Sequence, residues 1–491
     1  MTNAANVSFG LETLKGVSAK LAMYGFGFVA TAYFARELGP ATFGGFFLLL
    51  SVVQFANRIP HGIGGACQKR LAETETSNDE LLGLTLGVWV ASGLVVALLA
   101  VAGRAHLTAY TGVSNAASLG VGLFVAISLF LPLQFLLAGT GKFGVTNWID
   151  LLREIVKTGL QFGLVALGFG VTGMTAGFVA ATLLTVPVIL FFLGVRPSLP
   201  SRDTAAYVWE YARYNVPSNV VGKAYTRFDI FLLGAIGLTA GVGYYEVALS
   251  LTGLATLISG VVMDGLISKT SNLSSRGRSI ADSVTATISY TSVIAIPMLV
   301  LVAFLGEPIV RAVYGAEYLA AVPYLLGIAA YRVVQTQREP LDSAVKGMGR
   351  PDAVFRISTV TVAVNFVLGV ALVLTVGAIG VVVATVVAET VRCLLLHRAL
   401  RRNDTVVPVF PAPLRAQFRS ALAMAAVMVV LTVTLPAAVA APLVVTGGLG
   451  LATYLGTVLA QDGVARAAIA RAAVAVHALA TGAEVDQQTT H

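Results

Sequence analysis

Apolar residues fill the chain in windows of about 20 residues, the length that an α-helix needs to cross the hydrocarbon core of a bilayer. Short polar or glycine-rich segments separate these windows. They lie near residues 12–34, 41–66, 81–102, 117–139, 150–168, 171–194, 208–236, 240–268, 284–305, 319–342, 352–374, 378–396, 416–436 and 440–460. The pattern predicts an all-α polytopic membrane protein with about fourteen transmembrane helices.

Composition supports lipid as the main solvent of this chain. Hydrophobic residues make up 57% of it and charged residues 11%, and its mean hydropathy is +0.84. A soluble domain carries roughly 25% charged residues, so too little charge is present to cover a soluble surface. The formal net charge is +8, but the basic residues are spread over many short loops. That spread argues against a nucleic-acid partner, which calls for a basic patch.

The distribution of basic residues predicts the orientation. With the N-terminus in the cytoplasm, about 20 Lys and Arg residues fall in cytoplasmic segments and only about three, Arg36, Arg104 and Arg311, fall outside. The opposite orientation would invert this ratio. We therefore expect a multi-pass protein of the cell membrane with both termini in the cytoplasm.

The chain repeats itself at an offset of about 207 residues. Residues 132–142 match residues 340–350 in their Pro-Leu and Gly-x-Gly spacing, and residues 170–173 match residues 377–380. Residues 45–47 (GFF) likewise parallel residues 243–245 (GYY). Each unit holds six spans, an even number, so the two units insert in the same orientation as a parallel repeat.

The repeat predicts four parts of the chain and a mechanism. We expect an N-lobe with spans 1–6 (1–200), a C-lobe with spans 7–12 (201–402), two accessory spans (403–461), and a cytoplasmic amphipathic helix with a disordered tail (462–491). Two bundles that face each other enclose a central cavity and can rock about it. This is the architecture of alternating access.

Charged residues inside the predicted spans are the candidate functional residues. Each costs several kcal/mol in hydrocarbon unless it faces a cavity or a partner. The basic candidates for binding a substrate headgroup are Arg58, Lys157, Lys223, Arg227, Arg332 and Arg338. The acidic candidates, for ion coupling or for charge pairing, are Asp229, Glu246, Asp264, Glu339 and Asp342.

Four of these cations, Arg58, Lys157, Lys223 and Arg332, have no evident acidic neighbour on their own helix. A lining of unpaired cations fits an anionic substrate such as a phosphate or pyrophosphate headgroup. Snorkelling to the interface is the alternative interpretation for Lys157, Lys223 and Arg338. Pro60, just after Arg58, should kink span two near that site.

Signatures of catalysis are absent from the sequence. There is no G-x-x-x-x-G-K-[ST] phosphate loop, the five histidines lack metal-ligand spacing, and no large loop carries a Ser/His/Asp arrangement. We therefore expect a transporter without catalytic residues, metal or cofactor.

Several segments, in order, resemble the polysaccharide flippases of the multidrug/oligosaccharidyl-lipid/polysaccharide (MOP) exporter superfamily. They are residues 37–44 (ELGPATFG), 313–318 with 321–323, 347–351 (GMGRP), and Asn365 with 377–380. Residues 338–344 (REPLDSA) with 350–352 resemble the haloarchaeal branch. Residues 58–60 (RIP) resemble the span-two motif of lipid-linked peptidoglycan flippases, where the Arg lines the cavity. Family members commonly carry Asp-Arg at the end of span seven, and here Ile230 follows Asp229.

The resemblance implies a flippase that moves a dolichol phosphate- or pyrophosphate-linked sugar to the outer leaflet, for surface polysaccharide or protein N-glycosylation. It implies membrane lipids and glycosylation-pathway enzymes as partners. Coupling to H⁺ or Na⁺ stays open, with Asp229, Glu246, Asp264 and Glu339 as the acids that could bind such an ion. Two alternatives stay open. A cation-coupled multidrug antiporter of the same superfamily predicts twelve spans and an acidic cavity. A non-transporting component of a glycan assembly complex, or an enzyme acting on the lipid-linked sugar, predicts larger loops.

Overall fold

The computed structural model of the protein describes residues 9–72, 77–434, 440–463 and 466–467. Within these residues the regular elements are helices, and no β-strand occurs. The first part of the chain forms α1 (Phe9–Ala56), α2 (Arg58–Ala72), α3 (Asn78–Ala102), α4 (Arg104–Thr111), α5 (Ala116–Gly139), α6 (Phe143–Leu164), the π-helical turn η1 (Val165–Phe169) and α7 (Gly170–Leu193). The all-α class is confirmed.

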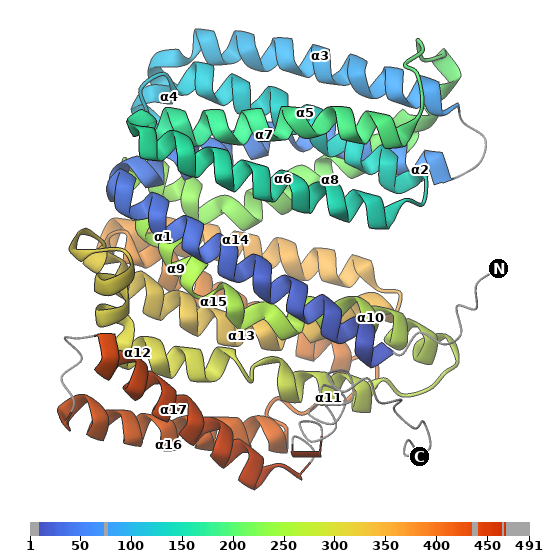
Figure 1. The fold of residues 1–491 in the computed structure, drawn as a ribbon. Helices are drawn as coiled ribbons and strands as arrows, with labels where there is room; N and C mark the ends of the chain where they lie inside the picture. Colours follow the sequence, from blue (N-terminus) through green and yellow to red (C-terminus); the bar gives the residue numbers. More distant parts are fainter. Residues whose placement is uncertain (1–8, 73–76, 435–439, 464–465, 468–491) are drawn as a thin grey trace, which may run out of the picture.

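The rest of the chain continues in the same way (Figure 1). It forms α8 (Arg202–Ala235), α9 (Thr239–Leu251), the 3₁₀ turn η2 (Gly253–Thr256), α10 (Leu257–Ser275), α11 (Ala281–Thr291), α12 (Ala295–Val313), the 3₁₀ turn η3 (Ala316–Ala321), α13 (Val322–Gly347), α14 (Pro351–Val376), α15 (Ile379–Arg401), α16 (Ala412–Thr434) and α17 (Ala440–Gln461). The amphipathic helix and tail predicted for residues 462–491 fall almost wholly outside the described residues.

Among the described residues, ten helical stretches are long and apolar enough to cross a membrane, or eleven if α9 with η2 and α10, bent by 50°, is one broken span. Two of the stretches, Gly25–Ala56 and Gly144–Leu193, each contain two predicted segments. In the first, Gly39 has φ +72° and the helix changes direction there. α8 is not in this set, and it carries charged residues along its length. The number of spanning stretches is therefore lower than the fourteen predicted, because two pairs of predicted spans are merged, α8 is left out and one predicted span is broken.

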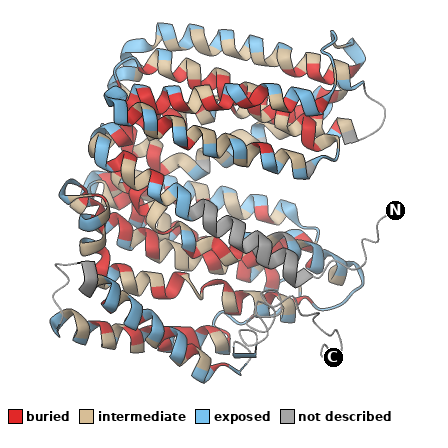
Figure 2. Cartoon of the chain, in the orientation of Figure 1, coloured by how far each residue is buried: buried red, intermediate tan, exposed pale blue. Residues whose placement is uncertain are grey.

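The exposed face of α3 shows which solvent surrounds the bundle. Leu94, Leu98 and Leu99 are 67%, 71% and 64% exposed. In Figure 2, α3 runs along one edge of the molecule and its outer face is exposed, whereas buried residues collect between the helices. A contiguous apolar surface of this kind is unfavourable in water. It is the surface expected of a helix that faces lipid.

The helices form two groups (Figure 1). Helices α2 to α7 pack on one another, α9 to α15 form the second group, and α16 with α17 packs on α12. Two long helices belong to both groups. α1 contacts α5 and α7 as well as α9 and α10, and α8 contacts α2 and α3 as well as α14 and α15. The lobe boundaries given by the repeat stay a prediction.

The two groups approach most closely where α1 crosses α9. A Cβ atom on Gly44 would lie 1.9 Å from the Thr239 carbonyl oxygen, and one on Gly243 would lie 2.3 Å from the Pro40 carbonyl oxygen. Only glycine allows this contact of backbone with backbone. Gly243 lies in the matched segment 243–245 and Gly44 immediately precedes the segment 45–47, so the starts of the two repeat units touch here.

Matched glycines at the ends of α5 and α13 make equivalent contacts. A Cβ on Gly139 would lie 2.9 Å from Leu71 of α2, and one on Gly347 would lie 1.9 Å from Thr270 of α10. In each unit, the fourth predicted span therefore packs its last turn against the end of the second. The backbone supports the internal repeat that the sequence predicts.

Two predicted spans are interrupted. Span two breaks at Asn57, between α1 and α2, three residues before Pro60. Proline has no N–H to donate to the carbonyl one turn earlier, so the predicted kink has its expected cause and is confirmed. The predicted span 240–268 breaks at η2. Interrupted helices in a bilayer are tolerated where the freed backbone faces protein or a cavity.

Candidate functional site: a central cationic cavity

A cavity of about 440 Å³ lies between α1, which contacts both helix groups, and α9, η2 and α13 of the second group. Its lining is Gly27, Phe28, Thr31, Phe47, Glu246, Leu249, Ser250, Gly253, Thr256 and Arg332. A smaller cavity of about 150 Å³ shares Gly27, Thr31 and Phe47 with it and extends to α6 and α7. Both interrupted spans contribute to this region, since Phe47 precedes the break in span two and Gly253 lies in the break of span eight.

Arg332 is the cation of the larger cavity. Its guanidinium donates to Gln335 Oε1 at 2.8 Å and to Thr252 Oγ1 at 3.4 Å. No carboxylate lies within ion-pair distance of it among the described residues. Neutral oxygen acceptors orient the guanidinium without cancelling its charge, so Arg332 keeps the capacity to bind an anion.

Glu246 connects this cavity to α8. Arg227 Nη1 lies 2.6 Å from Glu246 Oε1, and the two side chains are 22% and 10% exposed. The pair joins α8 to α9 across 19 positions in the sequence. Arg227 is therefore partly neutralised, and its carboxylate partner faces the same cavity as Arg332.

Two further cations approach the same region without a carboxylate partner among the described residues. Lys223 of α8 lies close enough to Arg58 and Arg227 for electrostatic interaction, with Glu246 as the compensating acid. Arg58, at the start of α2, donates to the Gln54 carbonyl oxygen at 3.0 Å. Arg227, Lys223 and Arg332 thus lie near one carboxylate, Glu246, and Arg58 lies near Lys223.

Lys157 requires a correction. Its ammonium lies 2.6 Å from Glu154 Oε1, one turn earlier on α6. Lys157 therefore does have an acidic neighbour on its own helix. Both residues line the smaller cavity. The i,i+3 spacing of Glu154 and Lys157 is visible in the sequence, and it is the signal that would have identified this pair.

Asp229 of α8 is a buried carboxyl group of a different kind. It is 8% exposed, and its Oδ2 accepts hydrogen bonds from the Tyr245 hydroxyl and, at 2.9 Å, from the Thr385 hydroxyl. Its Oδ1 has no hydrogen-bond partner in the described part of the chain. Arg227, two positions earlier, is paired with Glu246 instead. A carboxyl group without a basic partner is costly in a membrane interior unless it binds a cation or a proton.

Arg338 belongs to a separate ionic network. It pairs with Asp342 on its own helix, with Glu389 of α15 at 2.6 Å, and more loosely with Glu339 at 3.6 Å. Arg392 of α15 completes the network at 2.7 Å from Asp342. The charge of Arg338 is thus neutralised within the protein.

Sequence reasoning missed Glu389 and Arg392. Both lie inside the apolar segment 378–396, where a charged residue indicates an ion pair or a functional site. Of the predicted acids, Glu339 also accepts a hydrogen bond from Gln335 at 2.8 Å. The side chain of Asp264 lies outside the described part of the structure.

Comparison with known proteins shows where this fold and these residues belong. A family model described as "Polysaccharide biosynthesis protein" matches residues 33–323. The chain belongs to this family. The match covers the second half of α1, both interrupted spans and the helices that contribute Arg58, Lys223, Arg227 and Glu246, and it ends at the start of α13. The MOP exporter resemblance found in the sequence is thereby confirmed.

Two curated relatives of this polysaccharide biosynthesis protein come from Haloferax volcanii. "Probable flippase AglR" is 28% identical over 408 residues, which are 82% of this chain and 85% of the relative. "Probable low-salt glycan biosynthesis flippase Agl15" is 25% identical over 376 residues, 76% of this chain and 79% of the relative. Both agree with the haloarchaeal resemblance seen in the sequence.

Solved structures show the same fold at low identity. The inward closed conformation of the lipid II flippase MurJ has a TM-score of 0.76 and 16% identity, and it covers 91% of this chain and 98% of its own. An inward-facing multidrug resistance MATE transporter of the MOP superfamily has a TM-score of 0.61 and 17% identity, and it covers 76% and 93%. The fold is shared with flippases and with drug transporters, so fold alone does not choose between these functions.

Proposed function

We propose that this protein is a flippase that carries an isoprenoid phosphate- or pyrophosphate-linked sugar, with dolichol as the isoprenoid, from the cytoplasmic to the outer leaflet. The sugar would feed surface polysaccharide or S-layer protein N-glycosylation. The probable flippase function of the two relatives supports the transport of a lipid-linked glycan. The cation that lines the cavity supports a negatively charged headgroup.

The observation that carries the proposal is the charge of the central cavity. Arg332 lines it without a carboxylate partner among the described residues. Glu246 of the same lining is paired with Arg227, and Lys223 adds a second cation near Glu246. A phosphate or pyrophosphate group is the ligand that such an excess of cations recognises. A drug antiporter for cationic substrates would call for the opposite sign, so the cavity favours the flippase over that alternative.

The mechanism follows from where the two helix groups touch. In the described state they meet backbone to backbone at Gly44 and Gly243, which closes one end of the interface. With both termini in the cytoplasm this is the outer end. The headgroup enters from the cytoplasmic side and binds Arg332, while the isoprenoid tail stays in the bilayer. Separation of α1 from α9 then opens the outer end, which completes an alternating-access cycle.

Arg332→Gln tests the proposal in a strain that lacks the chromosomal gene. Loss of the unpaired cation should lower surface glycan by about tenfold or more and leave lipid-linked sugar in the cytoplasmic leaflet. Leaflet position is measured by the accessibility of the lipid-linked sugar in intact and in lysed cells. Arg311→Gln is the matched control, because Arg311 is exposed and pairs with Glu307 at 2.9 Å, away from the cavity.

Arg332→Gln should lose surface glycan, whereas Arg311→Gln should keep it. Normal glycan with Arg332→Gln, at a protein level equal to wild type, would remove Arg332 from the transport mechanism. Normal glycan and normal leaflet distribution in the deletion strain itself would refute the flippase function and support the drug antiporter.

We further propose that Asp229 carries the coupling ion, with H⁺ as the simplest case. The support is its burial beside two hydroxyl donors and no basic partner. Asp229→Asn keeps the shape of the side chain and removes its titration. In proteoliposomes, wild-type flipping should accelerate when a pH gradient is imposed, and the variant should not respond. An equal response of both proteins would exclude this role.

A further inference from the structure

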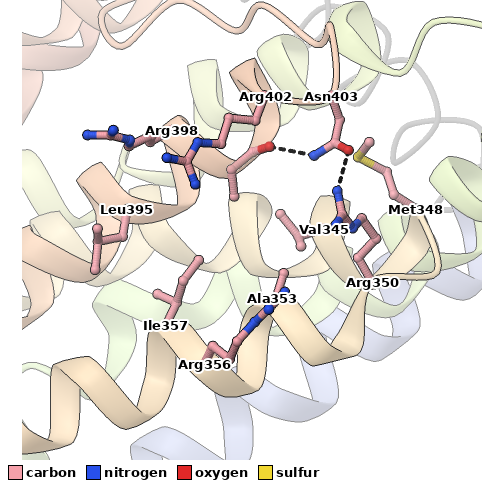
Figure 3. Close-up of a pocket in the computed structure, with 11 residues that line it drawn as sticks. Val345, Met348, Arg350, Ala353, Arg356, Ile357, Leu395, Arg398, Arg402 and Asn403 are labelled. Atoms are coloured by element: carbon pink, nitrogen blue, oxygen red, sulfur yellow. Dashed lines mark hydrogen bonds between the residues drawn. The ribbon is translucent and has the colours of Figure 1, made fainter.

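A second pocket lies outside the central cavity, at the end of the second helix group where α13, α14 and α15 meet (Figure 3). It has a volume of about 520 Å³. Its lining is Val345, Met348, Arg350, Ala353, Arg356, Ile357, Leu395, Arg398, Ala399, Arg402 and Asn403. Four of these eleven residues are arginines, and nothing in the proposed transport cycle uses them.

The arginines differ in how far their charge is compensated. Arg356 pairs with Asp352 at 2.6 Å on α14. Arg350 donates to the Asn403 side-chain oxygen, a neutral acceptor. Arg398 and Arg402 have no carboxylate partner among the described residues. The pocket therefore holds uncompensated positive charge, concentrated on the side that α15 contributes.

Arg398, in the last turn of α15, and Arg402, the residue that caps this helix, also stand four positions apart. Their like charges repel each other, and an anion bound between them relieves that repulsion. The Asn403 side chain, which donates to the Ala399 carbonyl oxygen at 2.7 Å and accepts from Arg350, fixes the opposite wall. Figure 3 shows these two bonds and the arginines around the same hollow. The arginines are themselves exposed, and they share the rim of one concavity.

The rest of the lining is apolar. Ile357 and Leu395 are half-buried and lie deeper along α14 and α15, toward the middle of these spans. α14 begins at Pro351 and α15 ends at Arg401, so the arginines stand at the level where a membrane-spanning helix leaves the bilayer. A charged rim above an apolar groove matches an amphiphile, with an anionic headgroup above acyl chains. Basic pockets between transmembrane helices bind acidic lipid headgroups in this way.

We propose that this pocket binds the phosphate of an acidic membrane phospholipid such as phosphatidylglycerol. The phosphate lies between Arg398, Arg402 and Arg350, and an acyl chain lies along Ile357 and Leu395. The bound lipid joins the ends of α13, α14 and α15 from the membrane side. This site is independent of the transported sugar, and it holds whether or not the flippase proposal does.

Binding of dioctanoyl phosphatidylglycerol to the purified full-length protein in neutral detergent, measured by native mass spectrometry, tests the proposal. Arg398→Gln/Arg402→Gln should weaken it by about tenfold. Arg401→Gln is the matched control, because Arg401 is exposed on the same helix and does not line the pocket. It should bind as wild type does. If the double variant does not purify as a folded protein, Arg402→Gln alone should show the same direction with a smaller loss.

Three outcomes would overturn the assignment. Equal binding by wild type and the double variant would remove the pocket from lipid recognition. An equal loss in Arg401→Gln would show diffuse attraction to a basic surface. Displacement of the lipid by millimolar inorganic phosphate, or equal binding of dioctanoyl phosphatidylcholine, would show that the pocket recognises a soluble anion or no charge at all.

Discussion

The two halves of the molecule share a backbone plan and differ in where they keep their charges. In the register of the repeat, Phe124 and Phe130 of α5 correspond to Arg332 and Arg338 of α13. The two phenylalanines are 0% and 1% exposed and belong to the apolar core of the first group. The equivalent arginines face the central cavity and the buried ionic network.

The same contrast holds for α7 and α15. Thr182 and Thr185 of α7 correspond to Glu389 and Arg392 of α15. The threonine hydroxyls donate hydrogen bonds to carbonyl oxygens of their own helix, as Thr182 does to the Phe178 carbonyl oxygen at 2.7 Å. The charged pair instead joins α15 to α13. The first half thus holds its fourth and sixth spans together with apolar and small side chains, and the second half with ions.

The first half places its charges on α6. Arg153 there lies over the ring of Phe130 at 4.6 Å, and it pairs with Asp150 at 3.1 Å. At the offset of the adjoining match, the positions of α14 that correspond to Asp150 and Arg153 are Ser358 and Thr361. Because the repeated backbone does not require these charges, each half is free to use them for a separate purpose. A cavity between two identical halves would lack the one-sided charge that Arg332 provides.

Arg338→Phe, which places the first-half residue in the second half, should have the largest effect. It leaves the carboxylates of Asp342 and Glu389 buried, at 6% and 2% exposure, with one cation fewer. Breaking a buried ionic network in this way costs about 3–5 kcal/mol. Thermal unfolding of the purified protein in detergent measures the loss, and a greatly reduced yield is the expected accompaniment.

Transfer of the whole first-half set is the control for that variant. Arg338→Phe, Asp342→Gln, Glu389→Thr and Arg392→Thr together remove all four charges at these positions. Of the network only Glu339 stays, at 20% exposure and with a hydrogen bond from Gln335. Replacement of buried ion pairs by packed neutral residues is often nearly neutral. The quadruple variant should therefore be more stable than the single one. If it is less stable, the contrast between ionic and apolar halves is wrong.

Alanine at the matched glycines Gly347 and Gly139 should have an intermediate and unequal effect. At Gly347 the new Cβ meets Thr270 Oγ1 at 1.9 Å and the Ile267 carbonyl oxygen at 3.0 Å. At Gly139 the new Cβ meets the Gln68 carbonyl oxygen at a similar 3.1 Å, but its nearest atom is the end of the Leu71 side chain at 2.9 Å, which can move. We expect a loss of about 1–3 kcal/mol for Gly347→Ala. Chemical unfolding of both variants measures the difference, and equal losses would show that the two contacts are equally tight.

Lys157→Met should have the smallest effect. The pair with Glu154 lies within one helix, the two side chains are 17% and 35% exposed, and Arg153 stays 4.0 Å from Glu154 after the change. An ion pair of this kind contributes less than about 1 kcal/mol. Thermal unfolding should barely shift, and surface glycan should stay near wild type. A loss of glycan with unchanged stability would instead assign Lys157 to the headgroup site.

Much of the fold could be predicted from local sequence. The apolar windows located the helices, Pro60 located the break at Asn57, and the Gly-x-Gly motifs located the turns at Gly141 and Gly349, both of which have positive φ. Each of these signals acts within one or two helical turns. Hydropathy, the missing N–H of proline and the freedom of glycine at positive φ need no information from the rest of the chain.

The sequence by itself determined that this is a helical membrane protein with an internal repeat and with cations inside its spans. Only the tertiary structure decided which of those cations are free. Arg227 pairs with Glu246 and Arg338 pairs with Glu389, whereas Arg332 contacts only neutral acceptors in the part of the chain that the structure describes. The reason is physical: hydropathy determines that a helix crosses the bilayer, whereas its rotation and depth are set by packing against neighbouring helices. Those two quantities decide which side chains meet.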